Sequence, residues 1–162
     1  MANNSRLLFI HGSESSSQTY KATLLRGLFP GMVTPDFTGL LDERMKQLAA
    51  IIDHTTGWTL IGSSLGGLMA ALFAAQAPGQ VRRLVLLAPA LNWPGIRNKL
   101  TIFQIPTVII HGTQDDVVPL AVVRPLAERI FTHLTYRVVD DDHRLHKTAE
   151  ALDWRSLLED RT

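Results

Sequence analysis

The sequence predicts an α/β fold, a three-layer sandwich in which a mostly parallel sheet of about six strands lies between two layers of helices. Two observations lead to this prediction. Short β-rich apolar runs alternate about six times with segments of helical period. These runs are continuously apolar rather than alternating with polar residues, which is typical of parallel strands buried on both faces. We expect right-handed crossovers between them.

The expected strands are short and bounded by turn-forming residues. The first is continuously apolar and ends at His11 and Gly12. The pattern predicts strands at 7–10, 32–36, 58–61, 83–88, 107–110 and 135–139. Ligands of such sheets bind beyond the carboxyl ends of the strands, so we expect the chemistry in the loops after Ile10, Ile61, Ala88, Ile110 and Val139.

The expected helices follow from apolar spacing and stop signals. Leu41, Met45, Leu48, Ala49 and Ile52 recur at a helical period. We predict helices at 19–28, 41–54, 65–77 and 143–158. The chain shows no repeat, linker or low-complexity segment, so we expect a single domain over residues 1–162, with one irregular connection at 89–106.

Composition excludes several classes of protein. The 162 residues are 46% apolar and 19% charged, which is not the composition of a disordered chain. A net charge of +1 indicates neither nucleic acid nor an anionic membrane as a partner. The absence of cysteine excludes disulfides, thiol catalysis and cysteine-ligated zinc.

No segment has the pattern of a membrane or export signal. Residues 1–6 lead directly into an apolar run without the regions of a signal peptide, so we expect a cytoplasmic protein. Residues 57–81 lack charged side chains, but their helical part, 65–77, would reach only about 20 Å. A bilayer core is about 30 Å thick, so we predict no membrane span.

A G-x-S-x-G motif follows the expected strand at 58–61 and precedes a helix. A serine on this tight turn lifts its hydroxyl above the sheet edge, and the flanking Gly62 and Gly66 avoid clashes that a Cβ would cause. The register selects Ser64 rather than Ser63 as a nucleophile. The alternatives are an ordinary Gly/Ser turn or a phosphate-binding loop; no Gly-Lys-Ser/Thr follows, which excludes a Walker loop.

A serine nucleophile needs a base and a carboxylate that orients it. His143 follows the last expected strand and is the candidate base, with a histidine beside helix-capping aspartates as the alternative. Asp115 follows the strand at 107–110 and is the candidate acid. Asp116 is its rival, although a turn that bonds its own backbone suits Asp116 better. The order Ser64, Asp115, His143 is that of hydrolases.

The acidic run before the last helix offers a further interpretation. Asp142 is expected to cap that helix. His143 and His146 share a helix face and could ligate a metal with the aspartates, but a structural use of the aspartates is the simpler interpretation, and we predict no metal site.

Two backbone N–H groups should stabilise an oxyanion. Leu65, the residue after the nucleophile, is expected to supply one, and Ser13 or an immediate neighbour the other. His11 is a candidate to hold this loop through a backbone hydrogen bond.

Taken in order, four segments resemble the α/β-hydrolase superfamily, in particular its small lidless bacterial esterases. They are 7–12, 62–67, 111–119 and 141–145. The resemblance implies strand order 2-1-3-4-5-6 and Ser64, Asp115 and His143 as catalytic triad, with the Leu65 and Ser13 amides at the oxyanion. The extra N-terminal strands and the cap of larger members are absent, which suggests an open site. The residues that could line it are Asn92, Trp93, Ile96, Val117 and Val118.

The leading hypothesis is hydrolysis of a small-molecule carboxylic ester or thioester through an acyl-enzyme, with no metal or organic cofactor. A second hypothesis is a non-catalytic member that binds a small hydrophobic ligand or a protein partner. A third is a flavodoxin-like nucleotide binder using the 12–19 loop, which Glu14 opposes and which leaves Asp115 and His143 unexplained. A homodimer is an option that the sequence leaves open.

Overall fold

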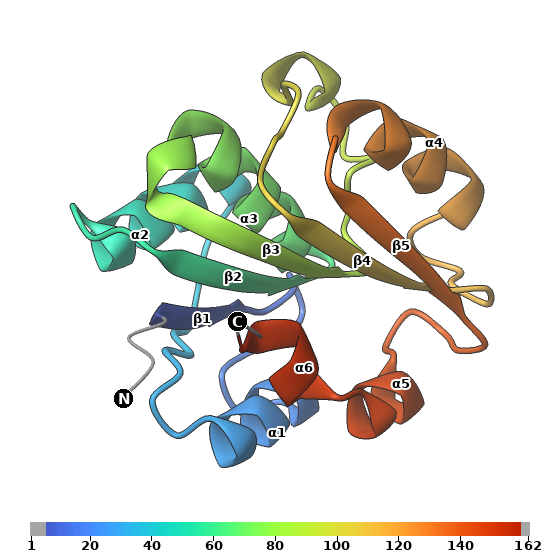
Figure 1. The fold of residues 1–162 in the computed structure, drawn as a ribbon, viewed down its shortest axis with the longest axis horizontal. Helices are drawn as coiled ribbons and strands as arrows, with labels where there is room; N and C mark the ends of the chain where they lie inside the picture. The colour runs from blue at the N-terminus through green and yellow to red at the C-terminus, as the bar shows by residue number, and fades with distance from the viewer. Residues whose placement is uncertain (1–5, 160–162) are drawn as a thin grey trace.

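The structure is a computed structural model that describes residues 6–159, and these form a parallel five-stranded sheet with helices on both faces (Figure 1). The strands are β1 (Arg6–Ile10), β2 (Trp58–Ser63), β3 (Val81–Leu87), β4 (Thr107–Gly112) and β5 (Leu134–Val139). The helices are α1 (Tyr20–Leu28), α2 (Leu41–Ile52), α3 (Leu65–Gln76), α4 (Leu120–Ile130), α5 (His146–Ala151) and α6 (Trp154–Leu158). Two short 3₁₀ turns, Pro78–Gln80 and Arg97–Lys99, lie in the connections.

The fold class is confirmed, but the sheet has five strands rather than about six. The order is β1-β2-β3-β4-β5, with every neighbouring pair parallel. The expected strand at 32–36 is reduced to one bridge, in which Val33 pairs with Leu8 on the free edge of β1. It occupies the predicted position but does not extend, because Met32 closes a turn onto Phe29 and Pro35 has no N–H for a ladder.

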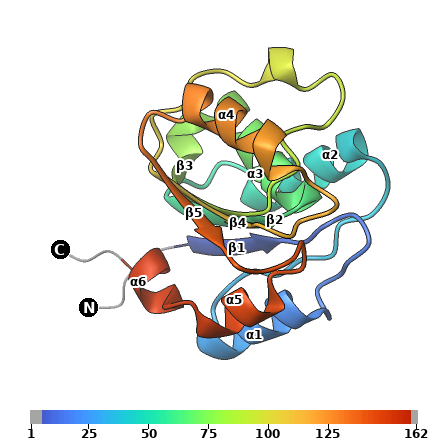
Figure 2. The ribbon, with the colours of Figure 1, turned by 90° about the vertical axis from the view of Figure 1, so that its right-hand side faces the viewer.

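Successive strand residues face different helical layers, so each strand contributes to two cores. In β1, Leu8 joins the core on the α2, α3 and α4 side, whereas Phe9 joins the core beside α1, α5 and α6. Leu60 and Ile61 divide in the same way in β2. Figure 2 shows the two helical layers on either side of the sheet. This arrangement explains why the strand sequences are continuously apolar.

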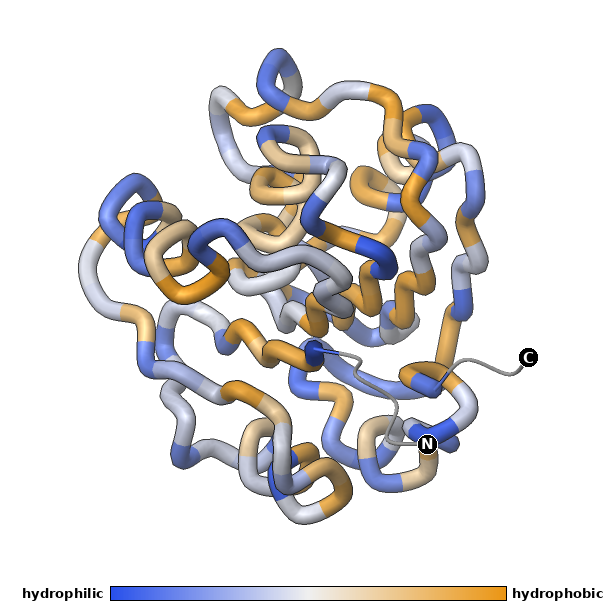
Figure 3. The backbone as a smooth tube through the Cα atoms, turned by 60° about the vertical axis from the view of Figure 1, so that its left-hand side comes forward, coloured by the Kyte–Doolittle hydropathy of each residue, from blue (hydrophilic) through white to orange (hydrophobic). Residues whose placement is uncertain are grey.

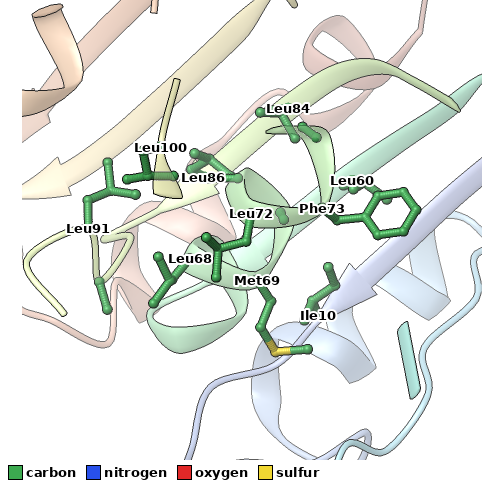
Figure 4. Packing of buried hydrophobic residues seen from close by; sticks show 14 of the residues in the cluster. Ile10, Leu60, Leu68, Met69, Leu72, Phe73, Leu84, Leu86, Leu91 and Leu100 are labelled. Atoms are coloured by element: carbon green, nitrogen blue, oxygen red, sulfur yellow. The ribbon is translucent and has the colours of Figure 1, made fainter. Parts of the chain in front are cut away.

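Helix α3 is the most buried helix and fixes the position of the turn that precedes it. Its residues from Leu65 to Ala74 are all buried. Figure 4 shows Leu68, Met69 and Leu72 of α3 packed among side chains of the neighbouring strands. The other helices are amphipathic, and hydrophobic and hydrophilic stretches alternate along them in Figure 3.

Two helical regions differ from the sequence expectation. Helix α4 was not among the expected elements, since Pro125 lies inside it and interrupts its helical pattern. The helix expected at 143–158 is instead two short helices, because Leu152 is extended and the Asp153 carboxylate caps a new start at Ser156 N–H.

Among residues 6–159, no helix combines the length and the apolar character that crossing a bilayer requires. Residues 1–5, on which the expectation about a signal peptide rests, lie outside the described residues.

Candidate active site

Ser64 lies on a strained turn between β2 and α3. Its φ of 55° and ψ of −116° are unfavourable for a residue with a Cβ. The turn is held from both sides, because the Ser64 N–H donates to the Leu87 carbonyl at 2.9 Å and the Ser64 carbonyl accepts from the Ala90 N–H at 3.0 Å. The strained conformation is therefore held in place by the sheet and by the loop after β3.

The glycines that flank Ser64 permit close approach of three backbone segments. A Cβ at Gly62 would overlap the backbone of Gly66, and a Cβ at Gly66 would overlap the carbonyls of Ile10 and His11. The end of β1 can thus pack directly against the start of α3. Both positions require glycine for this reason.

The structure brings Ser64, His143 and Asp115 together. The Ser64 Oγ lies 3.1 Å from His143 Nε2, and His143 Nδ1 lies 2.8 Å from Asp115 Oδ2. The Asp115 side chain is fully buried and the His143 ring is mostly buried, so solvent competes little for these bonds. Because Asp115 can only accept as a carboxylate, Nδ1 carries the imidazole proton and Nε2 is free to accept from the Ser64 hydroxyl.

Asp115 also shapes its own turn. Its second oxygen, Oδ1, accepts from the N–H groups of Val117 and Val118 at 2.9 and 2.7 Å. The turn-bonding role that the sequence assigned to Asp116 therefore belongs to Asp115, and Asp116 is exposed. Fixing Oδ1 in this way aims Oδ2 at His143.

A buried histidine lies behind the acid. His111 Nε2 is 3.0 Å from the Val118 carbonyl and 3.3 Å from Asp115 Oδ2, which requires a proton on Nε2. His111 Nδ1 then accepts from the Tyr136 hydroxyl at 2.7 Å. Burial raises the pKa of the Tyr136 phenol, with Arg124 opposing, so the phenol stays a donor. The series of polar contacts that links Ser64 through His143 to Asp115 thus continues through His111 to Tyr136 on β5.

The loop after β1 lies beside the turn at residues 62–66 (the elbow), and a Cβ at Gly12 would be 3.5 Å from the Ser64 Cβ. His11 does bond this loop, since its Nδ1 lies 2.7 Å from the Gly12 carbonyl while its Nε2 accepts from the Phe37 N–H at 2.9 Å. Within residues 6–159, the N–H groups of Ser13 and Leu65 donate to no protein acceptor. Neither N–H group is therefore committed to a protein partner.

A pocket of about 600 Å³ opens at Ser64 and His143. Its walls come from β1, the loop after it, α1, the elbow, and the loops before α4 and α5. The lining residues are Phe9, Gly12, Ser13, Glu14, Ser15, Thr19, Tyr20, Lys21, Ser63, Ser64, Val117, His143, Arg144 and His146.

Of the five residues proposed to line the substrate site, Val117 alone lines this pocket. Val118 is buried beneath it and offers its carbonyl to His111. Ile96 is buried in the core on the α2, α3 and α4 side. Asn92 and Trp93 are exposed on the connection after β3, outside this pocket. The α1 side of the pocket was missed because its residues follow a loop with no motif.

The rim of the pocket carries side chains of both charge signs, with Lys21 and Arg144 positive and Glu14 negative. Lys21 donates to the Arg144 carbonyl at 2.5 Å, and burial lowers the pKa of the Lys21 ammonium although Asp142 and Asp141 oppose this. Glu14 is also part of the lining.

The aspartates before α5 have structural contacts. Asp142 Oδ1 accepts from the N–H groups of Arg144 and Leu145 and so closes the turn before the helix. Asp141, rather than Asp142, reaches α5 itself, through the N–H and hydroxyl of Thr148. His146 packs against Tyr20. In the described part of the chain, no group of three or more His, Asp or Glu side chains could hold a metal ion.

Comparison with known proteins identifies the class that this fold and site define. A family model described as the alpha/beta hydrolase family matches residues 37–144, and the chain therefore belongs to that family. A curated relative, the biotin biosynthesis bifunctional protein BioHC of Teredinibacter turnerae, is 37% identical over 101 residues. The match covers 53% of this chain but 17% of that protein, so the chain spans only a small part of this relative's length.

Solved structures of hydrolases superpose over most of the chain. A structure described as a hydrolase of the alpha/beta superfamily, from Xanthomonas campestris, is 29% identical with a TM-score of 0.78, covering 91% of both chains. Est1E of Butyrivibrio proteoclasticus has a TM-score of 0.78 at 18% identity, covering 94% of this chain and 87% of its own. At 18% identity, the similarity to Est1E shows a shared fold only.

Proposed function

We propose that this α/β hydrolase is a serine hydrolase that cleaves a carboxylic ester or thioester through an acyl-enzyme on Ser64. The observation that carries the proposal is the pair of hydrogen bonds, 3.1 and 2.8 Å long, that link the Ser64 hydroxyl through His143 to Asp115. Strand ends far apart in the sequence supply these groups beside an open pocket.

In the proposed mechanism the Ser64 Oγ attacks the carbonyl carbon while its proton moves to His143 Nε2. The resulting imidazolium is stabilised by Asp115, which accepts from Nδ1 throughout. His143 then gives the proton to the departing alcohol or thiol, and the acyl-enzyme forms. Water, deprotonated by the same nitrogen, releases the acid and restores Ser64.

The oxyanion of each tetrahedral intermediate needs donors on the pocket side of Ser64. We assign these to the N–H groups of Leu65 and Ser13, of which Leu65 begins α3. The free N–H groups and the dipole of the helix N-terminus favour negative charge there. Loss of one such donor typically costs about 2.7–4 kcal/mol of barrier.

The substrate should be small or extended, since the 89–106 connection forms a short loop with one 3₁₀ turn rather than a cap domain. The acyl group would lie over Phe9 and Val117, and the leaving group would extend toward the polar rim. No metal or organic cofactor has a part in these steps.

The proposal is tested by turnover of a panel of p-nitrophenyl esters and acyl-CoA thioesters. Ser64→Ala should lower kcat by on the order of 10⁴-fold or more, because the acyl-enzyme can no longer form. Ser156→Ala is the control, since this serine is exposed on α6 and outside the pocket.

Turnover by the wild type that Ser64→Ala leaves intact would refute Ser64 as the nucleophile. A wild type without turnover on the whole panel, combined with tight binding of a small apolar ligand, would instead favour a non-catalytic binding protein on the same scaffold.

A further inference from the structure

A buried cation without a carboxylate partner lies behind the loop after β1. Arg44, on α2, is 6% exposed. In the described part of the chain, no Asp or Glu oxygen lies within ion-pairing distance of its guanidinium, and its recorded partners are three backbone carbonyls. A cation withdrawn from water normally requires a counter-charge, so the position of Arg44 calls for an explanation.

The three carbonyls join two segments that border the candidate active site. The Arg44 Nε donates to the Gly39 carbonyl at 2.9 Å. One terminal nitrogen donates to the Gly12 carbonyl at 3.3 Å, and the other donates to the Ser13 carbonyl at 3.2 Å. The planar fork of arginine suits two adjacent carbonyls in a way that a lysine ammonium does not.

These bonds fix the direction of the N–H groups on the other side of the same peptide planes. In a trans peptide the C=O and the next N–H point in opposite directions, and the described chain has no cis bond. Because the Gly12 carbonyl faces Arg44 and His11, the Ser13 N–H faces away from α2. Gly12 and Ser13 both line the pocket that contains Ser64, whereas Arg44 does not.

The positive charge of Arg44 and the direction of the peptide plane both make the Ser13 N–H a better donor toward the pocket. A guanidinium at the carbonyl end of a peptide dipole polarises the N–H at its other end, and the surrounding low dielectric strengthens the effect. Negative charge that develops in the pocket would therefore be met by an N–H that is both directed and polarised, without reorganisation during the reaction.

From these contacts we infer that Arg44 is a positioning residue for the oxyanion, which holds and polarises the Ser13 N–H from behind the loop, with His11 as its partner on the Gly12 carbonyl. The inference rests on the proposed function, since it assumes attack by Ser64. It assigns Arg44 to transition-state stabilisation and not to substrate binding, because the side chain does not line the pocket.

The test compares Arg44→Met and Arg44→Lys with a control, Lys46→Met, which removes an exposed positive charge from the same helix. Hydrolysis of p-nitrophenyl butyrate gives kcat and KM. Inhibition by 1,1,1-trifluoro-2-pentanone reports on the oxyanion, since addition of the Ser64 Oγ to this ketone moves the carbonyl electron pair onto oxygen and the serine proton onto His143.

We expect Arg44→Met to lower kcat about 10- to 100-fold, less than the loss of a whole oxyanion donor, with KM within about twofold of wild type. The inhibition constant of the ketone should rise by the same factor as kcat/KM falls. Arg44→Lys should lose less than Arg44→Met, because it keeps the charge but not the fork. Lys46→Met should match the wild type.

Unchanged kcat in folded Arg44→Met and Arg44→Lys, or a loss confined to KM, would overturn the inference. Should Arg44→Met not fold, Arg44→Lys decides alone by the same two readouts. A wild type without Ser64-dependent turnover would overturn the proposed function and the inference together, whereas normal wild-type turnover with unaffected Arg44 variants would overturn the inference only.

Discussion

Asp115 makes two kinds of contact with its two carboxylate oxygens. One carboxylate oxygen accepts from two backbone N–H groups of its own turn, and the other accepts from His143. The sequence predicted Asp115 as the acid, with Asp116 as its rival, and it expected Asp116 to be the residue that bonds its own turn. That Asp115 makes the turn bonds as well as the contact with His143 depends on how the turn directs its two oxygens, and that is a three-dimensional property.

The double role of Asp115 leads to different outcomes for two substitutions. Asp115→Asn keeps an oxygen for the turn but presents the wrong partner to His143 Nδ1–H, so kcat should fall on the order of 10⁴-fold with little change in stability. Asp115→Ala should also lose about 1–3 kcal/mol of unfolding free energy, because two N–H groups lose their acceptor. Urea denaturation and ester turnover measure the two effects.

Equal stability of the two Asp115 variants would contradict the assigned role of Oδ1, and near wild-type turnover in Asp115→Asn would contradict the proposed role of Oδ2.

At the scale of secondary-structure elements, β1, the elbow and α3 form one tightly packed unit. The sequence predicted this unit well, since a buried strand, G-x-S-x-G and an apolar helix are local patterns. It predicted α4 and the end of the chain poorly, because Pro125 and the break at Leu152 and Asp153 are local departures from helical period.

Arg44 was missed for an opposite reason. It lies on the buried face of α2 with Leu48 and Ile52, four and eight residues further on. A charged residue at an apolar position of a helical pattern was the available signal. What it contacts depends on the loop after β1, about thirty residues earlier in the chain, and no pattern within α2 contains that information.

Packing at the elbow predicts a severe effect of Gly66→Ala. The added Cβ would overlap two backbone carbonyls of the segment that ends β1, and backbone atoms cannot move aside cheaply. We expect a loss of about 3 kcal/mol or more of unfolding free energy, or failure to fold. Gly79→Ala is the matched control, because a Cβ there would meet nothing within 4 Å. Thermal and urea unfolding measure both, and similar stabilities would contradict this packing.

The loop after β1 is also tied to the segment after Val33, and this contact should depend on pH. Hydrogen bonds from the backbone and hydroxyl of Ser17 hold the pKa of Asp36 below its ordinary value of 3.8, against the effect of burial. A lowered folded-state pKa means that the contribution to stability is complete above the unfolded-state pKa. It is lost as the pH falls through the folded-state pKa.

The unfolding free energy of the wild type should therefore fall as the pH drops below about 4, and Asp36→Asn should show a shallower fall over the same interval. Asp116→Asn, which removes an exposed carboxylate, should keep the wild-type slope. Urea denaturation at a series of pH values measures this, and parallel curves for Asp36→Asn and wild type would rule out the contribution.

At the scale of the whole molecule, the fold leaves the site open. The sequence predicted this from the shortness of the 89–106 connection, but it did not predict that α1 would form a wall of the pocket. This wall forms only when α1 packs in one layer with α5 and α6. Lys21 then contacts the Arg144 carbonyl, and Tyr20 packs against His146.

Because the pocket is open, we expect kcat/KM to depend only weakly on the length of the acyl chain. In an enclosed tunnel each buried methylene contributes about 0.8 kcal/mol, roughly fourfold in kcat/KM, so four methylenes would give more than about 200-fold. In this pocket we expect a change of less than about tenfold between p-nitrophenyl butyrate and octanoate, because the added methylenes stay in water. A gain approaching the tunnel value would show that the chain encloses its substrate.

The central claim is that Ser64 is a nucleophile activated by His143. Intact-protein mass spectrometry after treatment with a fluorophosphonate, followed by peptide mapping, tests it most directly. We expect one adduct per chain, located on Ser64, absent in Ser64→Ala and much slower to form in His143→Ala. An adduct on another residue, or equal labelling of wild type and Ser64→Ala, would contradict it.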